Sequence, residues 1–202
     1  MSINKIGGVS RQPLSYQLVI HLKNLPVANI TEKLKTMGKT NTIIGIDPDV
    51  EKSGVAILTL EPYSLNLKSM TFSELVDFAY ASVEHKDDMS VVVEGGWINH
   101  SHFHLSAKTR GYLAARMGND VGRNHETGRK IIEVFEHLGY AVDIQKPLRK
   151  IWKGKDGKIT KQELEAFAGP VRLCNQDCRD AALLAWNKAG LAFVINKSDK
   201  SC

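Results

Sequence analysis

The chain has 202 residues and a net charge of +5, enough length for one domain with a substantial core but not clearly for two. Hydrophobic residues make up 43% of it and charged residues 24%, which are ordinary globular values. No stretch approaches the roughly 18 apolar residues of a membrane span, and we expect the N-terminal region not to be a secretory signal. The three cysteines lack metal-like spacing, so we expect packing roles in a reducing, cytoplasmic setting.

Residues 1–40 do not form a clear pattern; a strand at 16–22 and a short helix at 32–37 are the best candidates. The core begins with two apolar runs, which predict strands at 42–47 and 53–60. Asp47 ends the first run, and Pro48 stops the strand because proline has no N–H to donate. A carboxylate at the end of a buried strand is costly unless it is paired, which makes Asp47 a candidate functional residue.

The rest of the chain alternates between apolar runs and helical patterns. The predicted elements are a third strand at 65–70, a helix at 74–85 capped by Ser73, a fourth strand centred on Val91–Val93, helices at 105–117 and 126–138 separated by a Gly118–Gly122 break, a fifth strand at 140–144, and helices at 160–168 and 176–189 with Asn175 as the last N-cap. This order predicts an α/β fold with a mixed sheet whose first three strands are antiparallel. We expect residues 1–40 to be an accessory extension, 41–190 the main domain and 191–202 a tail.

Four carboxylates are placed where they could meet. Asp47 and Glu94 each end an apolar strand, while Asp177 and Asp180 lie three residues apart on the last helix, which puts them on one face. Converging carboxylates repel unless cations lie among them, and oxygen-only ligands suit Mg²⁺, with Mn²⁺ as a possible substitute. Two such ions can activate a water and stabilise the leaving oxygen of a phosphodiester. The alternative for the helix pair is ordinary acids favoured by the helix dipole.

A basic segment with one tryptophan spans residues 146–161. Its cations are Lys146, Arg149, Lys150, Lys153, Lys155, Lys158 and Lys161. Such a run is either a solvated loop or a contact for a polyanion such as nucleic acid. Together with the acids, it favours phosphate contacts, with Lys150 and Lys161 as phosphate ligands or as stabilisers of transition-state charge.

Other residues have two readings each. Trp97, just past the fourth strand, could stack on an unpaired base or belong to the core. Arg110 and the arginines that follow it could widen the basic surface or simply face solvent. The alternating His100, His102 and His104 lack a companion Cys or acid at metal-ligand spacing, so a loop is favoured over a metal site. The second half of an EF-hand pattern at 156–164 lacks the first carboxylates, which excludes calcium binding there.

Ile43–Leu58, Val91–Trp97 and Asn175–Trp186 resemble the three acidic motifs of the RuvC-type Holliday junction resolvases, which belong to the RNase H-like superfamily. The resemblance covers about residues 42–188. It implies a five-stranded mixed sheet, with three antiparallel strands followed by two parallel ones, flanked by helices. The family also carries a proline, a lysine, a glycine-containing loop and a second lysine, which Pro147, Lys150, Gly157 and Lys161 match in order.

The resemblance implies that Asp47, Glu94, Asp177 and Asp180 hold two Mg²⁺ ions and that Lys161 assists catalysis. The implied protein is a cytoplasmic homodimer, of bacterial or phage type, that cuts Holliday junctions or related branched DNA. The longer stretch after Glu94 and the N-terminal extension depart from the family and leave the substrate open. RNA–DNA hybrids, flaps and forks are alternative substrates, and a junction-binding module without cleavage is the non-enzymatic alternative. Actin-like ATPases share the first hairpin but need a longer chain with a second phosphate loop.

Overall fold

The computed structural model describes residues 40–98, 111–172 and 175–193. The candidates at 16–22, 32–37, His100, His102, His104 and Arg110 lie outside these ranges, and the domain boundaries stay a prediction. Within the described residues, no helix combines the length and apolar character that crossing a bilayer requires.

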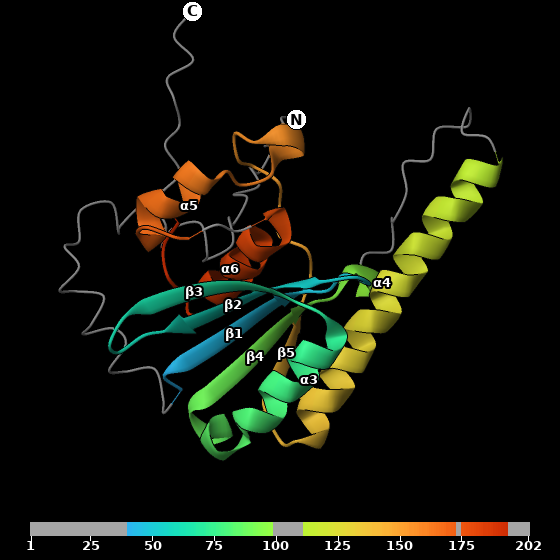
Figure 1. The fold of residues 1–202 in the computed structure, drawn as a ribbon. Coiled ribbons are helices and arrows are strands. Elements are labelled where there is room, and N and C mark those ends of the chain that lie inside the picture. Colours follow the sequence, from blue (N-terminus) through green and yellow to red (C-terminus); the bar gives the residue numbers. More distant parts are fainter. Residues whose placement is uncertain (1–39, 99–110, 173–174, 194–202) are drawn as a thin grey trace, which may run out of the picture. The chain divides into compact units, whose positions relative to one another are not determined.

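The described elements form a mixed five-stranded sheet with helices on both faces (Figure 1). They are β1 (Thr42–Asp47), β2 (Ser53–Thr59), β3 (Ser64–Met70), α3 (Phe72–Ala81), the 3₁₀ turn η1 (Val83–Asp88), β4 (Met89–Glu94), η2 (Gly96–Ile98), α4 (Gly111–His137), β5 (Ala141–Gln145), η3 (Lys155–Gly157), α5 (Lys161–Ala168) and α6 (Gln176–Lys188). The strand order is β3-β2-β1-β4-β5; β1, β2 and β3 pair antiparallel, whereas β4 pairs parallel with β1 and β5. This confirms the predicted five-stranded mixed sheet, in which three antiparallel strands are followed by two parallel ones.

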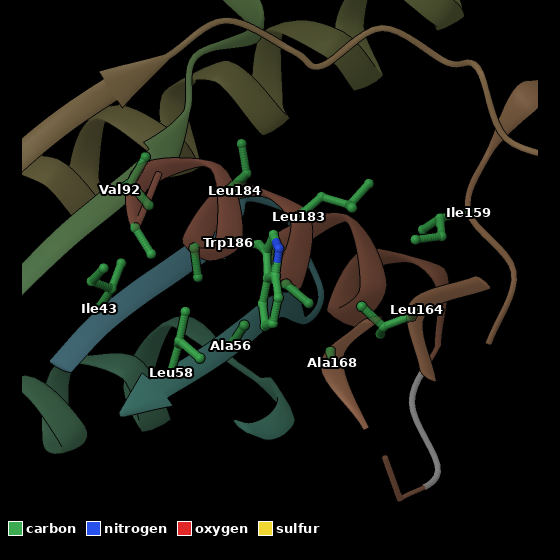
Figure 2. Close-up of a cluster of buried hydrophobic side chains, with 14 of the residues drawn as sticks. Ile43, Ala56, Leu58, Val92, Ile159, Leu164, Ala168, Leu183, Leu184 and Trp186 are labelled. Carbon is green, nitrogen blue, oxygen red and sulfur yellow. The ribbon is translucent and has the colours of Figure 1, made fainter. Parts of the chain in front are cut away.

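The strands β1, β2 and β4 are buried on both faces, which explains why they read as continuous apolar runs. On one face, α5 and α6 cover a core that includes Ile43, Leu58, Val92, Leu184 and Trp186 (Figure 2). Leu191 and Phe193, which the prediction places in the tail, also pack against this core.

On the other face, α3 and α4 cover a second core with the intervening strand residues. Ile44, Val91 and Val93 from the strands meet Phe135 of α4 and Leu75 of α3 there. Consecutive strand residues therefore serve opposite cores, as the twofold repeat of a strand requires.

The predicted break at Gly118–Gly122, between helices at 105–117 and 126–138, is wrong, because α4 runs continuously through both glycines. Neither glycine has a positive φ, and a Cβ placed on either would meet nothing within 4 Å. Glycine weakens an exposed helix by roughly 1 kcal/mol but ends it only when it adopts a left-handed cap. Gly139 and Gly190 do adopt positive φ, and they follow α4 and α6 as predicted.

The predicted cap of the first helix is also wrong. Thr71, not Ser73, caps α3, and it forms a reciprocal capping box with Glu74. The threonine and glutamate stand at the spacing that defines this motif, so the sequence carried the signal. The cap of α6 at Asn175 is confirmed, since its side chain accepts a hydrogen bond from the Cys178 N–H.

Candidate active site

The strand topology brings Asp47 and Glu94 to the same edge of the sheet. Asp47 is the last residue of β1 and Glu94 is the last of β4. These strands are parallel neighbours, with Ile46 opposite Val93 in the register. Because parallel strands present their carboxyl ends at one edge, the two carboxylates follow directly from the pairing.

Two glycines let α6 approach this edge closely enough to add its own acids. A Cβ on Gly54 would lie 2.1 Å from the carbonyl carbon of Asp177, and one on Gly45 would lie 2.2 Å from the carbonyl oxygen of Ala181. Gly54 is the register partner of Asp47, so the first turn of α6 lies beside the end of β1. The absence of a side chain at Gly54 is therefore what allows Asp177 to reach the site.

The four predicted acids line one pocket of about 240 Å³. Each of the four side chains is partly buried, and all four lie at this one site. Three cations also line this pocket, namely Arg149, Lys150 and Lys158. The structure thus brings together residues from β1, β4, α6 and the basic segment.

Burial and mutual repulsion disfavour ionisation of the acids. Burial, followed by the charges of Glu94, Asp180 and Asp177, holds the pKa of Asp47 well above its ordinary value. Burial and then the charge of Asp180 raise the pKa of Glu94 to about 7, against the opposing effect of Lys150 and Lys158.

The pKa of Asp177 is also raised, first by burial and then by the charge of Asp49. Asp49 lines the same pocket but was not among the predicted acids. Its position two residues after Asp47 was the available signal.

Oxygen donors at this density fit a hard divalent cation such as Mg²⁺ or Mn²⁺, because a cation would relieve both the repulsion and the loss of solvation. Asp47, Glu94, Asp177 and Asp180 are the residues that could hold it. In residues 40–98, 111–172 and 175–193, however, no three His, Cys, Asp or Glu side chains stand close enough to hold an ion as they are. Binding would therefore draw the carboxylates together.

Helix α4 contacts the loop between β1 and β2 through Asn124, which sequence reasoning missed. The Asn124 Oδ1 accepts a hydrogen bond from the Val50 N–H at 3.2 Å, and its Nδ2 donates to Asp49 Oδ2 at 3.5 Å. The same Asp49 side chain accepts from the Glu51 N–H at 2.9 Å. No local pattern marks Asn124, because only the packing of α4 places it beside this loop.

Trp97 is partly buried in η2 and packs against the second core. Its ring lies edge-on to His125 at 5.9 Å between centroids, and the Arg129 guanidinium lies 5.2 Å from the ring centroid. A Cβ on Gly128 would come within 2.8 Å of the ring and 3.2 Å of Pro48 Cγ, so Gly128 makes room for both. Base stacking by Trp97 stays a prediction.

The remaining predicted lysines do not line the pocket. Lys153 and Lys155, the latter the first residue of η3, are exposed in the segment before α5. The Lys161 Nζ lies 3.5 Å from Glu165 Oε1, one turn along α5. Of the basic segment, it is Arg149, Lys150 and Lys158 that lie beside the acids.

No protein-family model matches the chain, and no curated protein matches it. Two solved structures of RuvC from Thermus thermophilus are similar at 12% sequence identity, with 76% of this chain and 99% of theirs covered. The TM-score is 0.44 for the RuvC structure in complex with a Holliday junction substrate and 0.42 for a RuvC structure. At that level of similarity, function has to be argued from the site itself.

Proposed function

We propose that this protein is a divalent-cation-dependent endonuclease that hydrolyses phosphodiesters in branched DNA, with the Holliday junction as its expected substrate. The observation that carries the proposal is one pocket that is lined by four acids and by three cations of the basic segment, namely Asp47, Glu94, Asp177, Asp180, Arg149, Lys150 and Lys158. Acids that hold cations beside lysines and an arginine are the combination that phosphodiester hydrolysis needs. The resemblance of the three acidic motifs to the RuvC-type resolvases supports branched DNA as the substrate.

In the proposed reaction, the oxygen of one water forms a bond to phosphorus and the bond from phosphorus to the 3′ oxygen breaks. The products are a 5′-phosphate and a 3′-hydroxyl; one proton of the water ends on that hydroxyl and the other is released to solvent. Bound Mg²⁺ ions, two in the family pattern, would supply Lewis acidity for this hydrolysis. The four acids would hold the ions, while Lys150 and Arg149, which also line the pocket, would hold the DNA backbone.

The proposed partner is a second copy of the chain, because the resemblance implies a homodimer and a two-fold axis presents two sites to a four-way junction. The N-terminal end of α4 extends beyond the sheet (Figure 1), and the apolar side chains of Tyr112, Leu113 and Met117 in that helix are exposed. Exposed apolar side chains on a projecting helix support association. Multi-angle light scattering would measure the mass in solution, and a monomer at micromolar concentration would contradict this part.

The test is nicking of a synthetic four-way junction in Mg²⁺ at fixed ionic strength, since phosphate binding depends on salt. Linear duplex, flap, fork and RNA–DNA hybrid of matching sequence serve as competing substrates. Asp47→Asn and Glu94→Gln are expected to lower the cleavage rate by at least about 10³-fold and to retain junction binding. The matched controls are Asp77→Asn on α3 and Glu136→Gln on α4, both exposed and outside the pocket.

Undiminished cleavage by either pocket variant would remove that acid from the mechanism. Preferential cutting of a flap, fork or hybrid would support the proposed nuclease activity but would change the substrate assigned to it. Tight junction binding without any cation-dependent cleavage would favour the alternative of a non-cleaving binding module.

A further inference from the structure

Five acids and three cations line the pocket. Lys158 is the cation whose charge affects most of these acids. Its Nζ lies 4.0 Å from Asp180 Oδ2. Its charge also opposes the upward shifts in the pKa of Asp47, Glu94 and Asp177. The Lys158 ammonium therefore pairs with Asp180, and its charge also favours the ionised forms of the other three predicted acids.

A compact turn fixes the backbone that carries Lys158. The Gly154 N–H donates to the Lys158 carbonyl at 3.0 Å, and the Lys158 N–H donates to the Lys155 carbonyl at 3.1 Å. A Cβ on Gly154 would lie 2.4 Å from the Lys158 carbonyl oxygen, so a side chain there would disrupt the turn. Gly157, with a φ of +74°, lies against the backbone of Lys150, where a Cβ would be 2.8 Å from the carbonyl oxygen.

The residue after Lys158 anchors this turn to the helix that carries two of the acids. Ile159 is 1% exposed and belongs to the first core. Its carbonyl accepts a hydrogen bond at 3.1 Å from Nε of Arg179, which stands between Asp177 and Asp180 in α6. The position of Lys158 is thus fixed relative to the α6 acids by the backbone and does not depend on its own ion pair.

Lys161, which the resemblance to the resolvases implies as the catalytic lysine, lies elsewhere. It is the first residue of α5, it does not line the pocket, and its ammonium pairs with Glu165 on the same helix. The capping box of Thr160 and Glu163 fixes where α5 begins, and so fixes Lys161 on the helix instead of on the turn.

We propose that Lys158, not Lys161, is the catalytic lysine of this pocket: its ammonium offsets part of the charge of the acids in the cation-free protein and contacts the scissile phosphate once divalent ions are bound. The inference rests on the proposed function and names the residue that completes its site. The acids would hold a divalent cation that offsets their charge, and the Lys158 ammonium would then be free to offset charge on the phosphate oxygens. Lys158 consequently competes with the cation for the acids in the absence of DNA.

The experiment compares Lys158→Met and Lys161→Met in the full chain, with Lys158→Arg to restore the charge and Lys130→Met on exposed α4 as the control. The first readout is single-turnover cleavage of the four-way junction, in which Lys158→Met is expected to lose about 10²-fold and Lys158→Arg to recover part of that. The second readout is Mn²⁺ binding without DNA by calorimetric titration. There, Lys158→Met is expected to bind roughly two- to fivefold more tightly, because an ion pair of this exposure is lost.

A larger cleavage loss in Lys161→Met than in Lys158→Met would overturn the inference and leave the nuclease proposal standing. Unchanged or weaker Mn²⁺ affinity in Lys158→Met would overturn the counter-ion role by itself. A failure of the unmodified protein to cleave any branched or hybrid substrate would instead overturn the proposed function, and the catalytic role of Lys158 with it.

Discussion

Replacing Glu94 with glutamine is expected to stabilise the cation-free protein at alkaline pH. Burial and the charge of Asp180 raise the pKa of Glu94 to about 7 in the folded state, against an ordinary value of 4.5. One pKa unit corresponds to about 1.36 kcal/mol, so a difference of roughly 2.5 units costs the folded state about 3 kcal/mol when the group is fully ionised. Glutamine keeps the shape of the side chain and removes the charge.

The sign of the pH dependence follows from proton binding. Below pH 4.5 the Glu94 carboxyl is protonated in both states and adds no penalty. Between pH 4.5 and 7 the folded state binds the proton that the unfolded state has released, so the free energy of unfolding falls as pH rises. Above pH 7 the whole penalty is present. The gain from Glu94→Gln should therefore be about 1 kcal/mol at pH 5 and about 3 kcal/mol at pH 8.

The assay is urea unfolding followed by far-ultraviolet circular dichroism in EDTA, at pH 5 and pH 8. A gain of 1 kcal/mol raises the melting temperature of a domain of this size by about 2–4 °C, which gives thermal unfolding as a second measure. Mg²⁺ should stabilise the unmodified protein more than the variant, because a bound cation removes the same penalty. The control is Glu136→Gln, which is exposed on α4.

The reasoning would be refuted by a Glu94→Gln variant no more stable than the unmodified protein at pH 8. A gain larger at pH 5 than at pH 8 would also contradict it, since the penalty then could not come from ionisation of Glu94. An equal gain in the stability of Glu136→Gln would show that removing any acid has this effect, whether or not the acid is in the pocket.

Two further perturbations test how the fold positions the site. Gly54→Ala is expected to destabilise the protein by about 1–3 kcal/mol and to weaken Mn²⁺ binding, because the new Cβ would meet the Asp177 backbone at 2.1 Å. Chemical denaturation measures the stability and calorimetry measures the binding. A variant as stable as the unmodified protein would show that the position of α6 does not depend on this contact. Asn124→Leu removes the hydrogen bonds to Val50 and Asp49. It should lower the cleavage rate about tenfold and change the free energy of unfolding by less than about 1 kcal/mol. An unchanged cleavage rate would show that Asn124 has only a packing role.

The sheet and its acids were readable from the sequence because local patterns determine them. Apolar runs buried on both faces marked β1, β2 and β4, and a carboxylate at the end of two of these strands marked the edge where the pocket forms. The i, i+3 spacing of Asp177 and Asp180 placed both on one face of α6. Such patterns depend only on residues that are close together in the sequence, and not on contacts with distant residues.

Other features depended on contacts between distant residues. The continuity of α4 through Gly118 and Gly122 could not be read locally, because glycine signals a break only when its backbone adopts the left-handed conformation. Asn124 stands about 75 residues from Asp49 along the chain, and only the packing of α4 brings their side chains together.

The sequence by itself determined which acids and which basic segment this protein has, and the order of the elements that carry them. The tertiary structure alone decided which cations stand beside those acids. Seven cations lie between residues 146 and 161, and their spacing does not show which of them reach the acids. The turn held by Gly154 and the bond from Arg179 to Ile159 put Lys158 in the pocket, whereas the first turn of α5 pairs Lys161 with Glu165. The physical reason is that charge is a property of a residue, whereas the distance between charges is a property of the fold.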